Sequence, residues 1–264
     1  MSSQRWREYH NGKDVPDFRE VHPIFQRALI DQLGQLISKL KLSPEKPIDL
    51  IDVGGGRGGL MLRALEKLTS SGRINVARVG AIDIDPIAME IYERNMRLDF
   101  PNVAVRTRAG DLRDPKVLAE LQGNIGGSER DTLVVSNYVL SYLNQSEGVN
   151  VMQSLERGMS TIDKSRQVAS LVTFNGGMGT QDLTNLPFVA GTLVAMARMG
   201  AHAPAAMRQM SALGVARKEA NPPSIDTHLQ DVQTVFAGSG NWVVESEQGA
   251  LTSASTASYI TRTP

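Results

Sequence analysis

The chain has 264 residues, 41% of them hydrophobic, with 28 basic and 28 acidic side chains. This length and content suit one large domain, or one domain with a sizeable insertion. The formal net charge of zero excludes a global field that would draw the chain to nucleic acid or anionic lipid. The absence of cysteine excludes disulfides, thiolate zinc sites and a cysteine nucleophile.

The chain contains no stretch that would enter or cross a membrane. Its first residues, MSSQRWREYHNGKDV, mix charged and polar side chains and lack the apolar core of a signal peptide. Nowhere do about 18 apolar residues follow one another. We therefore expect a cytoplasmic protein with no membrane partner.

Residues 1–47 precede the first predicted strand and are mixed in composition. Within them, residues 23–40 are expected to form a helix, because apolar side chains recur at helical spacing. These side chains are Phe25, Leu29, Leu33, Leu36 and Leu40. We expect residues 1–47 to form a helical segment or lid on a main domain that spans residues 48–264.

From residue 48 onward, short aliphatic runs alternate with longer amphipathic ones, which is typical of a mostly parallel sheet covered by helices. The predicted strands are residues 47–53, 76–83, 102–108, 131–137 and 167–174. The predicted helices between them are residues 59–70, 86–98, 114–122 and 146–160.

The C-terminal part of the chain departs from this alternation. Residues 241–248 and 257–263 are two strand-like runs whose connection, about ten residues, is too short for a helical crossover. They should therefore pair antiparallel. The predicted fold is α/β: a doubly wound, seven-stranded, mostly parallel sheet with an antiparallel C-terminal hairpin.

Residues 175–240 lie between strands five and six and are longer than one crossover helix requires. They are rich in alanine and methionine, and methionine adapts its shape to an apolar ligand. We expect a helical cap that recognises the substrate. Plain core packing and the contact surface of a homodimer remain alternatives for the same side chains.

Five glycines follow the first strand, in the stretch DVGGGRGGL. Glycines between a strand and a helix have no side chain, so a ligand can lie against the main chain, and the helix N-terminus favours an anionic group. Gly54, Gly56 and Gly59 fit the G-x-G-x-x-G pattern that binds a dinucleotide pyrophosphate. Gly54, Gly56 and Gly58 equally fit D-x-G-x-G-x-G, with Asp52 as its acid.

The second pattern resembles motif I of class I S-adenosylmethionine-dependent methyltransferases, and further phrases along the chain are similar to those of the same family. Residues 80–86, GAIDIDP, resemble the acidic phrase that ends strand two, and residues 106–114, RTRAGDLRD, resemble the phrase after strand three. The resemblance implies that Asp83 contacts the ribose, that Ile84 flanks the adenine, and that Asp85 caps the next helix.

The resemblance also implies S-adenosyl-L-methionine as the cofactor and a set of residues around it. Asp111 and Leu112 would meet the adenine, and Asn137, where strand four ends, would lie beside the reactive methyl group. The full implied set of cofactor contacts is Asp52, Gly54, Gly55, Gly56, Gly58, Asp83, Ile84, Asp111, Leu112 and Asn137.

The sequence does not identify a catalytic base. Histidine titrates closest to neutrality, and tyrosine can orient or deprotonate an acceptor, so the candidates are side chains expected around the pocket. They are Tyr9, His10, His22, Tyr138 and His228. No clustered spacing of acids and histidines resembles a divalent metal site, so no metal is expected.

We therefore expect a methyltransferase that acts on an oxygen or nitrogen atom of a small molecule, with specialised metabolism as its expected setting. Residues 175–240 lack the lysine and arginine track that nucleic acid requires, so no nucleic-acid partner is expected. An RNA or protein methyltransferase, a nicotinamide oxidoreductase, and a related protein repurposed for binding or another reaction remain alternatives.

Overall fold

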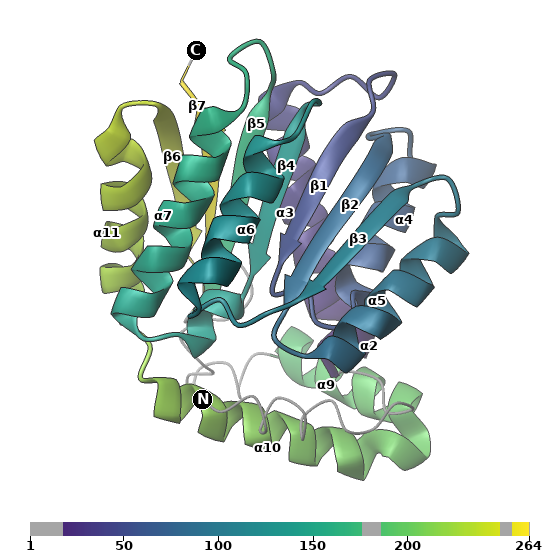
Figure 1. Cartoon of the computed structure of the whole chain (residues 1–264). Helices are drawn as coiled ribbons and strands as arrows, with labels where there is room; N and C mark the ends of the chain where they lie inside the picture. Colours follow the sequence, from purple (N-terminus) through teal and green to yellow (C-terminus); the bar gives the residue numbers. More distant parts are fainter. Residues whose placement is uncertain (1–17, 176–185, 249–254, 264) are drawn as a thin grey trace.

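The structure is a computed structural model that describes residues 18–175, 186–248 and 255–263. One seven-stranded sheet lies between two layers of helices, with strand order β3-β2-β1-β4-β5-β7-β6 (Figure 1). The strands are β1 Ile48–Val53, β2 Val76–Asp83, β3 Ala104–Ala109, β4 Thr132–Asn137, β5 Val168–Asn175, β6 Trp242–Gln248 and β7 Ser255–Arg262.

The first five strands pair parallel, and β7 runs antiparallel between β5 and β6. This confirms the predicted sheet and its reversed C-terminal hairpin. The strand order reverses between β1 and β4, which are neighbours. In open α/β sheets, such a switch point at the carboxyl ends of the strands is where ligands bind.

Each face of the sheet carries its own hydrophobic core. Helices α3 (Pro23–Leu40), α4 (Gly59–Ser70) and α5 (Pro86–Asp99) cover one face, and α6 (Pro115–Gly126), α7 (Gln145–Thr161) and α11 (Ile225–Phe236) cover the other (Figure 1). Side chains of β1 alternate between these cores, as the pleat of a strand requires. Leu50 packs in the first core, and Ile51 packs in the second.

Several helices begin where polar side chains satisfy their first amides. Asp85 caps α5, as predicted, and its Oδ1 accepts a hydrogen bond from the Ile87 amide over 2.9 Å. Asp114 caps α6 in the same way, and Asn144 forms a reciprocal capping box with Glu147 at the start of α7. Local sequence therefore fixes these boundaries.

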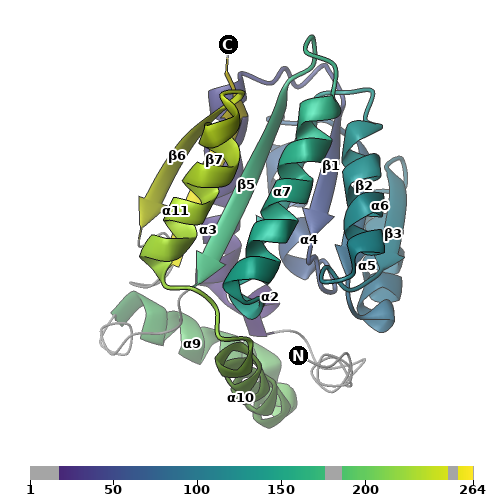
Figure 2. The same ribbon diagram turned by 60° about the vertical axis from the view of Figure 1, so that its left-hand side comes forward.

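The remaining helices gather at the carboxyl ends of the parallel strands. Helices α2 (Phe18–Val21), α9 (Leu186–Met199) and α10 (Ala203–Ala220) lie there, whereas α11 lies along the sheet itself (Figures 1 and 2). Short 3-10 turns are η1 Val139–Tyr142, η2 Gly200–His202 and η3 Ala237–Ser239. In the described part of the chain, no helix combines the length and apolar character needed to span a membrane.

Candidate functional site

The turn between β1 and α4, which we call the glycine loop (residues 54–58), has a backbone that depends on glycine. Gly54, Gly56 and Gly58 have φ angles of 74°, 55° and 82°. Side chains of L residues rarely tolerate this left-handed region, because the Cβ atom approaches the backbone too closely. The loop therefore keeps its shape only with glycine at these positions.

Most of these glycines make room for the protein itself. A Cβ atom on Gly54 would lie 2.4 Å from Cβ of Val139, and one on Gly58 would lie 2.6 Å from Cδ2 of Tyr92. On Gly55, it would lie 2.7 Å from Oδ2 of Asp52. Of the loop glycines, Gly56 alone has no heavy atom of the described residues within 4 Å of that position. Within the described structure, the open side of the loop is therefore at Gly56, and the cofactor contacts predicted for the loop glycines stay predictions.

A pocket that is open to solvent lies beside the glycine loop, at the switch point between β1 and β4. Segments from the N-terminal part of the chain complete its wall. It is lined by Arg19, Glu20, Leu29, Asp52, Gly54, Gly55, Gly56, Arg57, Leu60, Met61 and Asn137. Half of the ten predicted cofactor contacts therefore meet in one place.

Asp83 joins the end of β2 to the glycine loop. Its Oδ2 accepts a hydrogen bond from the Gly56 amide over 3.0 Å, and its Oδ1 accepts one from the Asp85 amide over 3.1 Å. Two backbone donors therefore hold the carboxylate in one orientation. A carboxylate oxygen has several lone-pair sites, so Asp83 can accept further hydrogen bonds from ligand hydroxyls.

Asp52 lies beneath the same loop and is only 3% exposed. Burial raises its pKa to about 7; a hydrogen bond from Tyr92 opposes the rise, and the charge of Asp83 adds to it. The Tyr92 hydroxyl donates to Oδ2 of Asp52 over 3.0 Å. Tyr92 was not among the predicted site residues. Its spacing from Met89 and Met96 predicts that it lies on the buried face of a helix, but this spacing does not predict that its hydroxyl contacts Asp52.

The N-terminus of α4, expected to bind an anionic group of the ligand, already meets a carboxylate of the protein. The Gly59 amide donates a hydrogen bond to Oε1 of Glu20 over 3.1 Å. The pocket beside it is also lined by Arg19 and by Arg57, which is 7% exposed. Together with Asp52, these groups offer both signs of charge, which suits a zwitterionic ligand end.

The other five predicted contacts lie outside the lining of this pocket: Gly58, Asp83, Ile84, Asp111 and Leu112. The Gly110 amide donates to the Asp83 carbonyl over 2.8 Å, which brings the chain before Asp111 to the end of β2. Burial acts to raise the pKa of Asp111, but the hydrogen bonds and charge of Arg113 outweigh it and lower that pKa. Leu112 is buried, and Ile84 is half-buried.

The end of β4 is tied to the end of β5. Thr173 Oγ1 donates to Oδ1 of Asn137 over 2.8 Å and accepts from the Tyr138 amide over 2.9 Å. Tyr138 adopts a left-handed conformation, with φ of 62°, and its ring centre lies 6.2 Å from that of Phe25. Burial raises the pKa of Tyr138, so its hydroxyl stays protonated.

Of the candidate histidines, His22 and His228 are buried and do not line the pocket beside the glycine loop. His22 caps α3, where its Nδ1 accepts from the Ile24 amide over 3.3 Å, and Nε2 lies 3.3 Å from Oγ1 of Thr192. His228 stacks on Phe174, with 4.3 Å between ring centres. Burial lowers the pKa of each histidine to about 4.

Tyr9 and His10 lie outside the described residues. Among the residues that are described, no group of three or more histidine, aspartate and glutamate side chains could hold a metal ion.

No family model matches the sequence, and no curated protein matches it. Solved structures do resemble the fold. The plantazolicin methyltransferase BpumL, in complex with SAH and a monoazolic desmethylPZN analog, matches with a TM-score of 0.55 and 8% identity, over 99% of this chain and 90% of that one. A putative S-adenosyl-L-methionine-dependent methyltransferase from Methanococcus maripaludis matches with a TM-score of 0.50 and 13% identity, over 99% and 92%. The chain therefore has the Rossmann-like fold of these enzymes.

Proposed function

We propose that this chain is an S-adenosylmethionine-dependent methyltransferase that methylates an oxygen or nitrogen atom of a small molecule. The observation that carries the proposal is the pocket at the switch point, where Gly56 faces open space and Asp83 is fixed beside it. The structural likeness to S-adenosylmethionine-dependent enzymes supports the same choice.

The residues of the pocket fit the parts of this cofactor. Asp83 would accept hydrogen bonds from ribose hydroxyls, and the open side of Gly56 would let the ligand approach the main chain. Arg19, Arg57 and the nearby acids would bind the amino-acid end, with Asn137 next to it. Beyond the pocket, Ile84, Asp111 and Leu112 would surround the adenine, as the sequence resemblance implies.

The bound cofactor would supply an electrophilic methyl group on a sulfonium. The sulfur leaving group loses its positive charge in the transfer, so it needs no acid. The protein's contribution would then be mainly alignment, which reaches effective molarities of about 10⁵ M in well-oriented systems. His22 and His228, with pKa values of about 4, are weak proton acceptors at neutral pH. Tyr138 suits a hydrogen-bonding role, and Tyr9 and His10 stay open as candidate bases.

Helices α9 and α10 are the proposed recognition elements, because they lie over the ends of the strands. They leave Leu193, Met207 and Val215 exposed, which suits an apolar acceptor or a second copy of the chain. The plantazolicin enzyme was solved in complex with a monoazolic desmethylPZN analog and SAH. Specialised metabolism and a cytoplasmic location complete this proposal; RNA and protein are the alternative acceptors.

The cofactor assignment is tested by calorimetry with S-adenosylhomocysteine and the variant Gly56→Val. Its matched control is Gly72→Val at the other end of α4, because Gly72 also has a positive φ, 65°, and open space around its Cβ position. Both variants should lose similar stability from backbone strain, about 1 kcal/mol or more. Only Gly56→Val should bind at least about 100-fold more weakly, the effect of losing about 3 kcal/mol. A wild-type protein that binds no S-adenosylhomocysteine, or an unaffected Gly56→Val, would overturn the assignment.

The acceptor is tested by incubating the protein with methyl-labelled cofactor and an extract of its host. The proposal expects the label in a small molecule, which mass spectrometry identifies. Label in RNA or protein would support the alternative acceptors. A protein that binds the cofactor and labels nothing would indicate the repurposed form.

A further inference from the structure

A second hollow lies on the sheet, on the face that α6 and α7 cover. We call it the arginine groove; it is open to solvent and is lined by residues of α6, β2 and β3. Its lining includes Arg78, Gly80, Arg106, Arg108, Glu120 and Leu121. None of them lines the pocket beside the glycine loop.

The strand register explains why this place is hollow and charged. Ile51, Gly80 and Arg106 lie side by side across β1, β2 and β3. Arg78 precedes Gly80 by two residues and Arg108 follows Arg106 by two, so all these positions share one face. Gly80 contributes no side chain, and Ile51 leans over it, with its Cδ1 3.0 Å from the place of a Cβ atom. The floor is thus aliphatic and flat.

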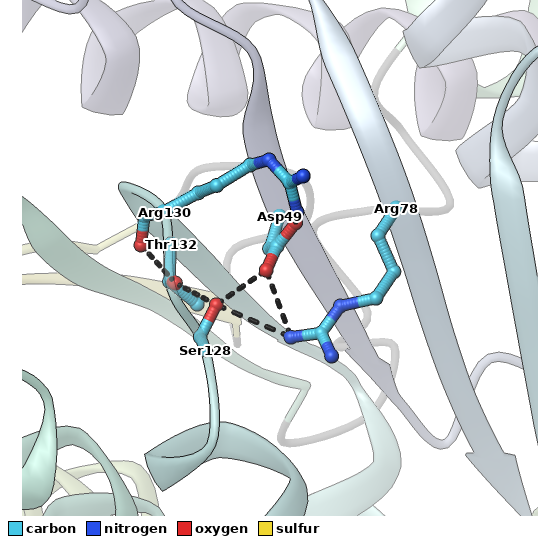
Figure 3. A network of polar contacts seen from close by, with 5 residues as sticks. All are labelled: Asp49, Arg78, Ser128, Arg130 and Thr132. Atoms are coloured by element: carbon cyan, nitrogen blue, oxygen red, sulfur yellow. Dashed lines mark hydrogen bonds and ion pairs between the residues drawn. The ribbon is translucent and has the colours of Figure 1, made fainter.

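Arg78 is held in place by a buried polar network at the start of the strands (Figure 3). Its Nη2 donates to Oδ2 of Asp49 over 2.8 Å and to Oγ of Ser128 over 3.2 Å. Asp49 is 1% exposed and also pairs with Arg130 over 3.3 Å. The guanidinium is therefore preorganised, and its buried Nε donor has no hydrogen-bond partner among the described residues.

The positive charge of the groove is only partly offset. Arg108 pairs with Glu120 over 2.8 Å, and Arg78 shares Asp49 with Arg130. Arg106 is exposed and forms no ion pair in the described part of the chain. Arg78 pairs with Ala104 and Gly80 pairs with Arg106, so Arg78 and Arg106 are diagonal neighbours on this face. Long side chains of like charge within reach of each other across a sheet repel, and an anionic ligand between them would offset the repulsion.

We propose that the arginine groove is a second ligand site, for a small organic phosphate. The phosphate would lie between Arg78 and Arg106, since guanidinium groups match phosphate oxygens in charge and geometry. A flat apolar group on the same molecule would rest on Gly80 and against Leu121. This proposal does not depend on the methyltransferase assignment, because the two sites share no lining residue.

The test uses 1-naphthyl phosphate as probe, titrated both with and without S-adenosylhomocysteine. Calorimetry should show binding below about 1 mM, and 1-naphthol should bind at least about tenfold more weakly. Arg106→Glu should weaken phosphate binding by about tenfold or more, since hydrogen bonds to charged groups contribute at least about 1.5 kcal/mol. The control, Arg63→Glu, changes an exposed arginine of α4 in the other helix layer and should stay within about twofold.

A second readout follows the backbone amides of Gly80 and Arg106 by NMR during the titration, and both should shift in the wild-type protein. Urea unfolding of Arg106→Glu checks that the variant is folded. Absence of probe binding, binding insensitive to Arg106→Glu, or shifts confined to the glycine loop would each overturn the proposal. Binding of a single-stranded RNA that is lost in Arg106→Glu, without binding of the naphthyl probe, would replace it with a nucleic-acid surface.

Discussion

The hydroxyl of Tyr92 donates a hydrogen bond to Oδ2 of Asp52 over 3.0 Å, directly beneath the glycine loop. The ring of Tyr92 also fills the space next to Gly58, so α5 supports a loop that comes well before it in the chain. The shape of the candidate cofactor pocket thus depends on this buried pair.

Tyr92→Phe should lower the free energy of unfolding by about 1–2 kcal/mol, because the ring still packs while a buried carboxylate loses its donor. Urea unfolding at pH 8 measures the change. In an Asp52→Asn background, the same substitution should cost less, since the two side chains form one interaction. Equal costs in both backgrounds would show that the charge of Asp52 adds nothing to this interaction.

Asp52 should make the protein less stable as the pH rises from about 4 to about 7. Its pKa is raised from 3.8 to about 7, so in this window the folded protein holds a proton that the unfolded chain has lost. Wild-type protein should therefore lose more than about 1 kcal/mol relative to Asp52→Asn across the window. Urea unfolding of both proteins from pH 4 to 8 measures this difference, and a constant difference would contradict the prediction.

His228 should have the opposite effect on stability. Its pKa is lowered from 6.5 to about 4, so the unfolded chain binds a proton first and stability is lost as the pH falls through this range. His228→Phe keeps an aromatic ring on Phe174 and removes the titrating group. The variant should be close to wild type at pH 8 and more stable by about 2 kcal/mol at pH 5. A variant that loses stability in parallel with wild type on acidification would exclude His228 as the cause.

Glu20 should stabilise the start of α4, because its carboxylate accepts from the Gly59 amide near the positive end of the helix. Glu20→Ala should lower the free energy of unfolding by about 1 kcal/mol, and Glu20→Gln by less. The loss should shrink at high salt, which screens the charge. Glu66→Ala, which removes an exposed acid later in the same helix, should change stability by less than about 0.5 kcal/mol.

Local patterns in the sequence were sufficient to predict the elements of the fold. The helix at residues 23–40 and the strand at residues 76–83 have the predicted bounds, because apolar periodicity and turn chemistry act within a few residues. The short connection before the last strand, which excludes a crossover, predicted the antiparallel hairpin. The positions of Gly56 and Asp83 could likewise be predicted from motif spacing.

The surroundings of those residues were decided by tertiary packing. Tyr92 reaches Asp52 from 40 positions away, and Glu20 reaches Gly59 from 39. The arginine groove requires the register of three strands, which brings Arg78 and Arg106 to one face beside Gly80. Such contacts depend on how helices rotate against the sheet and how strands align, and no short window of sequence encodes either. The sequence by itself therefore determined where the chain turns and pairs, whereas only the packed structure decided which side chains share a pocket.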